Sequence, residues 1–434
     1  MKPNNQLFSR LLLLALIGSC FQLQAQQHVI KKSFEAASEI NIRHRRGPLN
    51  VAPSEDGKVH FEAEISFEAK DKAEGEKLIK AFSVQAGKVG DRIDINSNLG
   101  IKSFNTIGRR STIIMGNGTK ITGISNLKVY LTVKVPEVRQ LKVDNRYDEI
   151  NVFVDVKEKL IVNAYSSEIR ISNISGDLAM SAKYSSGSVR TFKNGNIELY
   201  ESKINFEKGQ DIIFNAKYST VEVKSAESFK AESYENKFKL GNISGLFEID
   251  DKYSTFEMSD FEDAQLVLYE TDIRGNNGQD IRLQSKYSDL EWNSVGKVYF
   301  NSSYEDELRL ERAKSLQSVE SKYSKYKISE LENSLEIDSY EDDIWIAKVI
   351  SGMASISIQG KYTKLTCPIS ADTPFRIDMK ARYTSFDLEE DDLDIIKYID
   401  KGDTKEISGS RNQAGEQSLK IHIDCYDCKV QLKG

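Results

Sequence analysis

Tyrosine is the residue type in this chain whose spacing points most directly to binding chemistry. Fourteen tyrosines recur about every 18 residues, at Tyr147, Tyr165, Tyr184, Tyr200, Tyr218, Tyr234, Tyr253, Tyr269, Tyr287, Tyr304, Tyr323, Tyr340, Tyr362 and Tyr383. From Tyr184 to Tyr362 two contexts alternate, Lys-Tyr-Ser/Thr and Tyr-Glu. Rings with a polar tip could form a flat surface for a glycan or a peptide, or could serve only as a structural ladder.

Alignment on the apolar residues turns the two contexts into two columns. One column alternates lysine with tyrosine, and its neighbour alternates tyrosine with glutamate. The candidate binding residues on this surface are Tyr200, Tyr234, Tyr269, Tyr304, Tyr340, Lys217, Lys252 and Lys286. In this register each lysine lies between two tyrosines, so we expect lysine-over-ring contacts. Along each column like charges do not stack on one another until Lys361 meets Arg382. A slip of one coil would place lysine opposite lysine and glutamate opposite glutamate, so the alternation disfavours it.

The elements that position these residues are predicted to be short strands. Within a unit the apolar residues are spaced by two, as in Val221 and Val223, and that period is typical of a strand. Turn residues such as Asn194-Gly195 close many units, and no unit has room for a crossover helix. A fixed period of this size indicates stacked repeats. We therefore predict an all-β fold, a single-stranded parallel β-solenoid of about 18 residues per coil, and favour a right-handed β-helix.

Other residues with reactive side chains give weaker signals. Cys367, Cys425 and Cys428 are interpreted as a structural disulfide or as free thiols, in preference to a redox or metal site. The acidic run 389–392 with Asp394 is interpreted as a solvated loop, with a calcium site as the alternative. No catalytic residue, metal or cofactor is predicted. The basic run 43–46 is interpreted as a solvated strand end, with contact to acidic lipid headgroups or lipopolysaccharide as the alternative.

The N-terminus resembles a bacterial secretory signal. Residues 1–25 have a basic start, an apolar core from Leu11 to Ile17 and a small residue at Ala25, which predicts cleavage there and export. A lipid anchor at Cys20 is the alternative, because residues 17–20 resemble a lipobox. No later transmembrane segment is expected. The net charge of −6 argues against nucleic acid as a partner.

Four regions follow from these patterns. After the signal peptide, residues 26–137 are expected to form a β-rich cap. In it we expect strands at 40–42, 49–51, 59–67, 92–96 and 127–135, one helix at 70–82, and an exposed loop at 99–125. Residues 138–388 are expected to be the solenoid. Residues 389–434 are expected to hold an irregular insertion and then strands, from Ser418 to Leu432, that close the far end.

The pattern resembles a family of bacterial exported β-strand-repeat proteins of unknown function. The family is called "putative adhesins" and is related to the adhesin-head GIN domain. The matching segments are residues 40–51, 133–136, 145–150 and 418–432, and the resemblance covers most of residues 28–434. Where the family often has Tyr-Gly, this chain has Tyr-Ser or Tyr-Glu. The resemblance implies a solenoid at the cell envelope.

Together these patterns predict an exported, non-catalytic protein of a Gram-negative envelope. It would lie in the periplasm, on the outer membrane surface or outside the cell. Its predicted role is a structural scaffold or an adhesin-like surface, with a glycan or an envelope protein as the partner. The alternative is a carbohydrate-active solenoid enzyme, a polysaccharide lyase or hydrolase, which would need clustered acidic residues.

Overall fold

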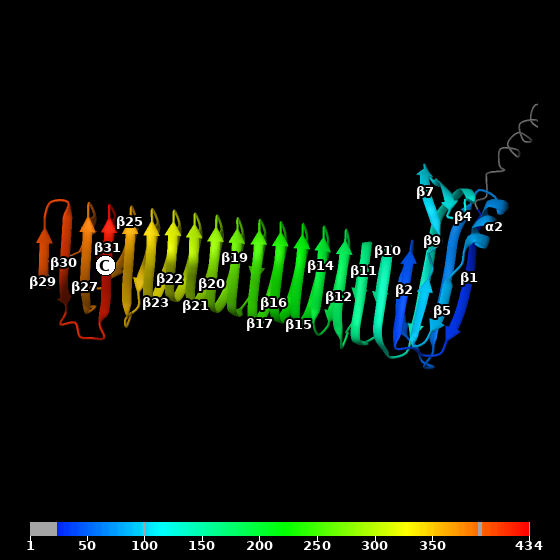
Figure 1. Ribbon diagram of the computed structural model, residues 1–434, viewed down its shortest axis with the longest axis horizontal. Helices are drawn as coiled ribbons and strands as arrows, with labels where there is room; N and C mark the ends of the chain where they lie inside the picture. Colours follow the sequence, from blue (N-terminus) through cyan, green and yellow to red (C-terminus); the bar gives the residue numbers. More distant parts are fainter. Residues whose placement is uncertain (1–23, 99, 389–392, 434) are drawn as a thin grey trace, which may run out of the picture. The chain divides into compact units, whose positions relative to one another are not determined.

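The computed structural model describes residues 24–98, 100–388 and 393–433. The chain divides into two compact units, residues 1–189 and 190–434, and each is described by itself. Nearly all of the described part of unit 1 is strand, with one helix (Figure 1). Its elements are β1 (Gln24–Phe34), β2 (Glu39–Arg45), β3 (Leu49–Pro53), β4 (Val59–Ala69), α2 (Lys72–Ala81), β5 (Gln85–Val89), β6 (Arg92–Asn96), β7 (Ile101–Ile107), β8 (Arg110–Met115), β9 (Lys120–Val135), β10 (Val138–Val152), β11 (Val156–Ile171), β12 (Asp177–Lys183) and β13 (Ser186–Thr191), the last of which ends just past the division.

The first part of unit 1 is a mixed sheet that carries the expected strands and helix. β4 alternates buried and exposed residues along its length, as a strand with one face on the core should. It pairs antiparallel with β1 and with β9. α2 begins after Asp71, whose carboxylate accepts a hydrogen bond from the Glu74 amide at 2.9 Å, a standard N-cap.

The expected exposed loop at 99–125 is wrong. The described residues from 101 to 125 form β7, β8 and the start of β9, joined as antiparallel hairpins. The glycines that suggested a loop are turn residues, and Gly108 and Gly118 take φ values of 63° and 85°. Across the turn that contains Gly118, Ile113 of β8 pairs with Ile121 of β9, and both side chains are fully buried. The turn chemistry was recognised, but the short apolar alternation between the turns was missed.

Parallel stacking begins inside unit 1. β10 pairs in parallel with β2 and β3 on one side and with β11 on the other. Leu141 of β10 therefore lies between Ile40 and Leu160 in one buried column. Because the cap and the first coils share these hydrogen bonds, the compact unit extends past the expected boundary at residue 137.

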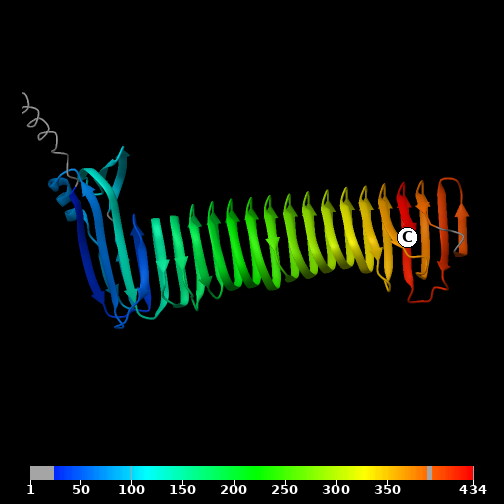
Figure 2. The same cartoon turned by 180° about the vertical axis from the view of Figure 1, so that it is seen from behind.

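Unit 2 is a stack of strands that are parallel except at β29 and β30 (Figure 2). Its elements are β14 (Gly195–Tyr200), β15 (Lys203–Lys217), β16 (Thr220–Tyr234), β17 (Lys237–Lys252), β18 (Thr255–Met258), β19 (Phe261–Tyr269), β20 (Asp272–Lys286), β21 (Asp289–Tyr304), β22 (Glu307–Lys322), β23 (Lys325–Tyr340), β24 (Asp343–Val349), β25 (Ser355–Lys361), β26 (Lys364–Ile369), β27 (Phe375–Arg382), β28 (Ser385–Asp387), β29 (Asp394–Asp400), β30 (Thr404–Arg411), β31 (Leu419–Tyr426) and β32 (Lys429–Lys433).

The predicted β-solenoid and its register are confirmed. Each coil pairs with the next about 18 residues later, so identical positions lie above one another. One interior column runs through consecutive coils as Val221, Phe238, Phe256, Ile273, Leu290, Leu308, Tyr326, Ile344 and Leu365. All nine side chains are fully buried. The handedness of the coil stays a prediction.

Two interruptions of the apolar columns have local causes. Gly275 occupies a core position beside Trp292, and a Cβ there would lie 2.5 Å from the indole. The indole of Trp292 thus fills the space that a larger residue would need. Asn301 falls in a β-bulge, where the strand register shifts by one residue. The bulge places Phe300, fully buried, in the column instead.

The C-terminal strands do not close the far end as expected. β31 pairs in parallel with β25 on one side and with β27 on the other, and β32 likewise lies between β26 and β28. Figure 1 shows β31 between β25 and β27. After β26 the chain skips the position of one coil and continues through β27 to β30. It then returns, and β31 and β32 occupy the skipped position. The insertion at 389–416 contributes β29 and β30, an antiparallel hairpin that pairs with β27.

Candidate functional site: a tyrosine rail on unit 2

Each coil of unit 2 turns one corner within two residues. The first of them has a left-handed backbone, for example Tyr218 with φ of 55° and Glu235 with φ of 50°. Its amide donates a hydrogen bond to a carbonyl of the next coil, as from Tyr218 to Tyr234 at 3.1 Å. Glycine and asparagine adopt this backbone most easily, and other residues incur about 1 kcal/mol or more. In unit 2, six tyrosines nevertheless occupy this position, Tyr218, Tyr253, Tyr287, Tyr323, Tyr362 and Tyr383.

The corner tyrosines and the tyrosines that precede the intervening corners form one row, which we call the tyrosine rail. Eleven contacts join its twelve rings in the order Tyr200, Tyr218, Tyr234, Tyr253, Tyr269, Tyr287, Tyr304, Tyr323, Tyr340, Tyr362, Tyr426 and Tyr383. The ring centroids are 5.3 to 5.9 Å apart and the planes cross at 77° to 88°. This is the edge-to-face arrangement that aromatic quadrupoles favour.

The predicted alternation of lysine and tyrosine in one column is confirmed by the strand register. Lys217 pairs with Tyr234, Lys252 lies between Tyr234 and Tyr269, and Lys286 follows Tyr269. The expected contact of lysine over the ring is not what joins the coils, because the ring contacts of the rail run between tyrosines. At the end of the rail Arg382 does lie over Tyr383, at 5.0 Å.

The expected meeting of Lys361 with Arg382 is wrong. Tyr426 of the inserted β31 pairs with both of them and separates the two cations. The next residue, Asp427, has φ of 52° and occupies the corner. Tyr426-Asp427 is therefore the tyrosine-acid unit that the alternation lacks between Tyr362 and Tyr383. Two basic-tyrosine units in succession were the sequence signal that a coil was missing there.

The rail is a half-exposed surface. The six corner rings are 40 to 52% exposed and Tyr426 is 37% exposed, while Tyr200, Tyr234, Tyr269, Tyr304 and Tyr340 are intermediate. Burial, followed by the charge of Glu270, raises the pKa of Tyr269. For Tyr340 the hydrogen bond with Glu341 is the main cause of its raised pKa. The hydroxyls of Tyr269 and Tyr340 therefore stay protonated near neutral pH and can both donate and accept hydrogen bonds.

Behind the rail lies a buried polar column that the sequence analysis did not identify. Its members are the second residue of each corner, and their side chains accept a hydrogen bond from the amide of the second corner residue of the previous coil. Ser219 Oγ accepts from the Ser202 amide at 3.2 Å, and Asn236 Oδ1 accepts from the Ser219 amide at 2.8 Å. Because a buried amide without a partner is costly, this column holds the corners in register.

Three carboxyl groups of unit 2 are buried in these corners, at Asp251, Asp306 and Asp342. Asp306 accepts from the amides of Ser288 and Tyr304 and from the hydroxyls of Ser285 and Ser303, at 2.8 to 3.1 Å. Burial raises the pKa of Asp306 to about 6 although these hydrogen bonds oppose the shift. Burial also raises the pKa of Asp342.

The remaining candidate residues form no second site. Cys367, Cys425 and Cys428 are buried and are free thiols in the structure, so a disulfide stays a prediction. Cys425 and Cys428 flank the corner of the inserted coil. The acidic run 389–392 lies outside the described residues, and Asp394 is exposed on β29. Within the described ranges, no three His, Cys, Asp or Glu side chains converge as metal ligands.

Unit 1 has a shorter row of tyrosine rings in contact. It also places the residues of the basic run 43–46 in different surroundings. Tyr165 contacts Tyr147 and Tyr184 edge to face, at 5.8 and 5.3 Å. Within the basic run, His44 is buried, with hydrogen bonds to Ser97 and Gly47, while Arg46 lies over Phe104 at 4.0 Å. The run therefore does not present one continuous basic face, which favours the strand-end interpretation.

Comparisons with known proteins add little to these observations. No family model and no curated protein matches the chain. A "putative cell adhesion protein" from Clostridium sporogenes is 9% identical, with 94% of this chain and 99% of that chain covered and a TM-score of 0.18. A "putative lipid binding protein" from Parabacteroides distasonis is 9% identical (77% and 94% covered, TM-score 0.20). A "putative adhesin" from Bacteroides fragilis is 12% identical (71% and 97% covered, TM-score 0.17). At these TM-scores the likenesses carry no argument.

The described residues include no helix with the length and apolar character to cross a bilayer.

Proposed function

We propose that this protein is an exported, non-catalytic scaffold of a bacterial cell envelope, and that its tyrosine rail is an adhesive surface for glycans. One observation carries the proposal, the unbroken row of twelve partly exposed rings along unit 2. Each ring is held by its neighbours before any ligand arrives. A preorganised surface loses little entropy on binding.

The position of the rings supports binding over a purely structural role. Six rail tyrosines of unit 2 stand at left-handed corners, where glycine or asparagine would strain the backbone less. A tyrosine kept at such a position contributes something that the turn itself does not need. Its ring offers an apolar face and its hydroxyl offers hydrogen bonds, the combination that suits a sugar.

The buried carboxyl groups support the non-catalytic part of the proposal. Asp251, Asp306 and Asp342 are at most 2% exposed. They are bound to corner amides and hydroxyls, such as Ser254, Ser288 and Ser324. Their burial is explained by the structure of the corner. Catalysis of glycoside cleavage instead needs paired acids that reach the substrate.

Replacement of three rail residues tests the proposal. In Tyr234→Ser/Tyr269→Ser/Tyr304→Ser, six of the ring contacts are lost. We expect binding on a glycan array to be lost while circular dichroism still shows folded β-structure. The matched control is Lys224→Ser/Gln265→Ser/Tyr299→Ser, on the same strands β16, β19 and β21 but off the rail, and it should bind as the wild type does.

A second variant separates binding from folding. Tyr234→Phe/Tyr269→Phe/Tyr304→Phe keeps the rings and removes three hydroxyls, so the fold should survive and glycan binding should weaken. If the serine variant unfolds and neither the wild type nor the phenylalanine variant binds a glycan, the rail is only structural. Release of reducing sugar by the purified protein would support a carbohydrate-active enzyme instead.

The mass of the mature chain distinguishes cleavage near Ala25 from lipidation at Cys20.

A further inference from the structure

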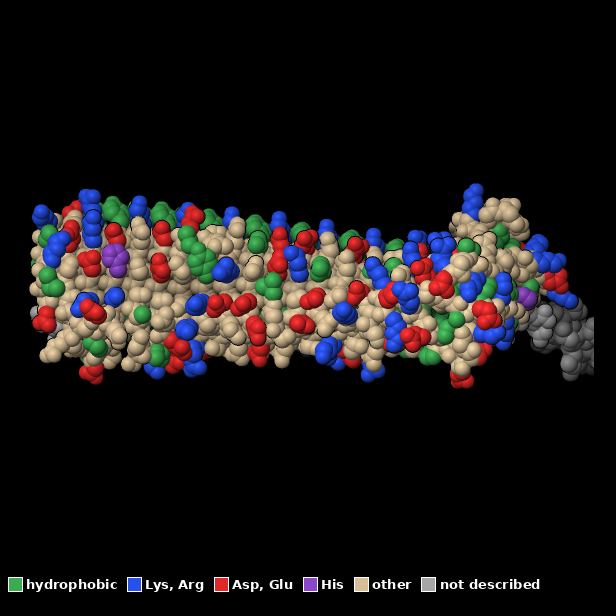
Figure 3. All heavy atoms as spheres, turned by 60° about the horizontal axis from the view of Figure 1, so that its bottom comes forward, with side chains coloured by type: hydrophobic (Ala, Val, Ile, Leu, Met, Phe, Trp, Pro, Cys, Tyr) green, Lys and Arg blue, Asp and Glu red, His purple; other side chains and the backbone are tan. Residues whose placement is uncertain are grey.

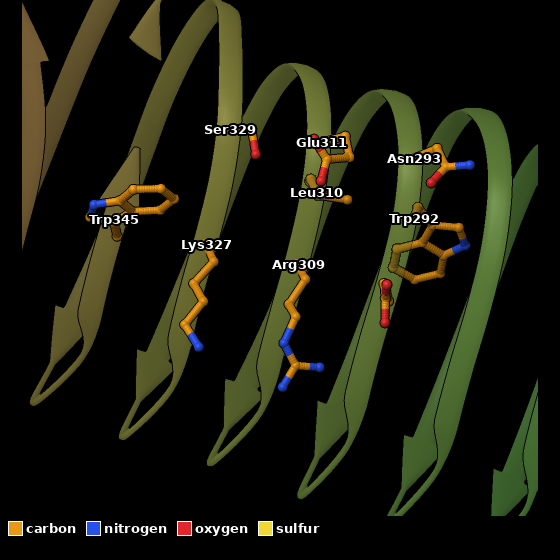
Figure 4. Close-up of a pocket in the computed structure, with 9 residues that line it drawn as sticks. Trp292, Asn293, Arg309, Leu310, Glu311, Lys327, Ser329 and Trp345 are labelled. Carbon is orange, nitrogen blue, oxygen red and sulfur yellow. The ribbon is translucent and has the colours of Figure 1, made fainter. Parts of the chain in front are cut away.

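Trp345 is an exposed tryptophan outside the tyrosine rail. It lies on β24, four residues past the corner at Glu341, and is 44% exposed. In the strand register it stands between Lys327 of β23 and Thr366 of β26. Figure 4 shows Trp345, Lys327 and Arg309 on three successive coils. Tryptophan is among the residues that most often carry binding energy at contact sites, so its surroundings are of interest.

Basic side chains gather around this ring. A hollow of about 350 Å³ is lined by Trp345, Lys325, Lys327, Lys364 and Asp343. A second hollow of about 210 Å³ beside Trp345 is lined by Arg309 and Lys327 but also by Glu291 and Glu311, so its charges balance. The first hollow therefore has three cations against one anion.

The charges here depart from the pattern of the rest of the surface. Over most of the face in Figure 3, acidic and basic side chains are interspersed. In the column that leads to Trp345, Glu257 is followed by Arg274 and Glu291 by Arg309, so that the charges alternate. The alternation then stops, because Arg309 is followed by Lys327 and Trp345.

Neighbouring acidic residues balance only part of this charge. Glu307 is shared between Arg309 at 2.8 Å and Lys327 at 2.7 Å. Lys364 lies 3.5 Å from Asp343. Lys325 has no ion-pair partner within the described part of the chain. In the first hollow the excess is therefore positive, and it lies beside the indole of Trp345.

We propose that Trp345, Lys325, Lys327 and Lys364 form a binding site for an acidic saccharide. The sugar ring would stack on the indole of Trp345, and its carboxylate or sulfate would contact Lys325 and Lys364. Stacking supplies apolar contact that any sugar can make, and the lysines select for the anion. The site is separate from the rail, so its test does not depend on the proposed function of the rail.

Fluorescence gives a direct measurement, because the chain has two tryptophans and Trp292 is buried, 1% exposed. Acrylamide should therefore quench Trp345 selectively. Oligogalacturonate should protect it from quenching, and a sulfated heparin oligosaccharide in a parallel titration reports whether sulfate replaces carboxylate. The methyl ester of oligogalacturonate keeps the ring and removes the charge, so it should bind at least about tenfold more weakly.

Variants complete the test. Trp345→Ala should abolish binding measured by calorimetry, and Lys325→Gln/Lys364→Gln should weaken it at least about tenfold and reduce its salt dependence. The matched control is Lys203→Gln/Lys237→Gln, whose lysines occupy the same column of the solenoid far from Trp345. It should bind as the wild type does, as should the rail variant of Tyr234, Tyr269 and Tyr304.

Three outcomes would overturn this site. They are an absence of protection by both acidic oligosaccharides, equal binding of the methyl ester, and unchanged binding by the Trp345→Ala variant. Trp345 is exposed, so its replacement should leave the circular dichroism spectrum of the solenoid unchanged. Loss of glycan binding by the rail variant alone would leave the site at Trp345 standing.

Discussion

Asp306 is the residue whose ionisation should be easiest to detect in the stability of unit 2. Its folded pKa of about 6 lies above the ordinary 3.8. A raised carboxyl pKa gives stability that is fully present below the unfolded pKa and is lost as pH rises through the folded value. Between pH 4 and 7 this group should remove up to about 3 kcal/mol of local stability.

Asp306→Asn should remove that pH dependence. Asparagine already serves at the same corner position in Asn236, whose Oδ1 accepts from the Ser219 amide. Hydrogen exchange of peptides covering β21 and β22, measured at pH 4 and pH 7, should show a smaller stability difference in the variant than in the wild type. The control Asp289→Asn changes an exposed residue of β21 and should keep the wild-type slope. An unchanged slope in Asp306→Asn would mean that Asp306 is already ionised at pH 4.

At the scale of residues, the sequence predicted the apolar columns and the exposed row of tyrosines but not the buried polar column between them. The alternation of Lys217 with Tyr234 was predicted because its residue types are distinctive and repeat in register. The buried column of Ser219 and Asn236 was missed because small polar residues normally mark exposed turns. Only the stacking of coils shows that these side chains complete the hydrogen bonds of the corner amides.

At the scale of elements, the inserted β31–β32 coil is the feature that sequence order could not reveal. Chain order predicts that neighbours in sequence are neighbours in space, and this holds along unit 2 as far as β25. Beyond it, β25 and β27 are separated by β31, which follows both in sequence. The alternation of basic-tyrosine and tyrosine-acid units contains this information, because Tyr426-Asp427 fits only the place between Tyr362 and Tyr383.

Replacement of Tyr426 tests the inserted coil. Tyr426→Lys would place a third cation between Lys361 and Arg382, and two cross-strand like-charge pairs should cost roughly 1 kcal/mol. Hydrogen exchange should then accelerate in β27, β30 and β31 and stay unchanged in β15 to β20. Tyr426→Phe keeps the ring and should exchange as the wild type does. Equal acceleration throughout unit 2 would contradict a local role for this coil.

At the scale of the whole molecule, the two units contain buried groups with opposite pKa shifts. In unit 1, burial lowers the pKa of His44 from 6.5 to about 4. The stability that neutral His44 provides is fully present above pH 6.5 and is lost as pH falls through 4. In unit 2, burial raises the pKa of Asp306 and of Asp342, which gives the opposite dependence.

Acidification from pH 7 to pH 4 should therefore destabilise the region around His44 and stabilise the corners around Asp306. The His44 contribution should reach up to about 3 kcal/mol. Hydrogen exchange resolved by peptide can follow both units in one sample of the full chain. His44→Gln should flatten the pH dependence of local stability in β2 and β3 and leave that of unit 2 unchanged. His422→Gln, at an exposed residue of β31, should leave the pH dependence of both units unchanged. If the local stability around His44 and around Asp306 changed in the same direction with pH, the assignment of these two buried groups would be wrong.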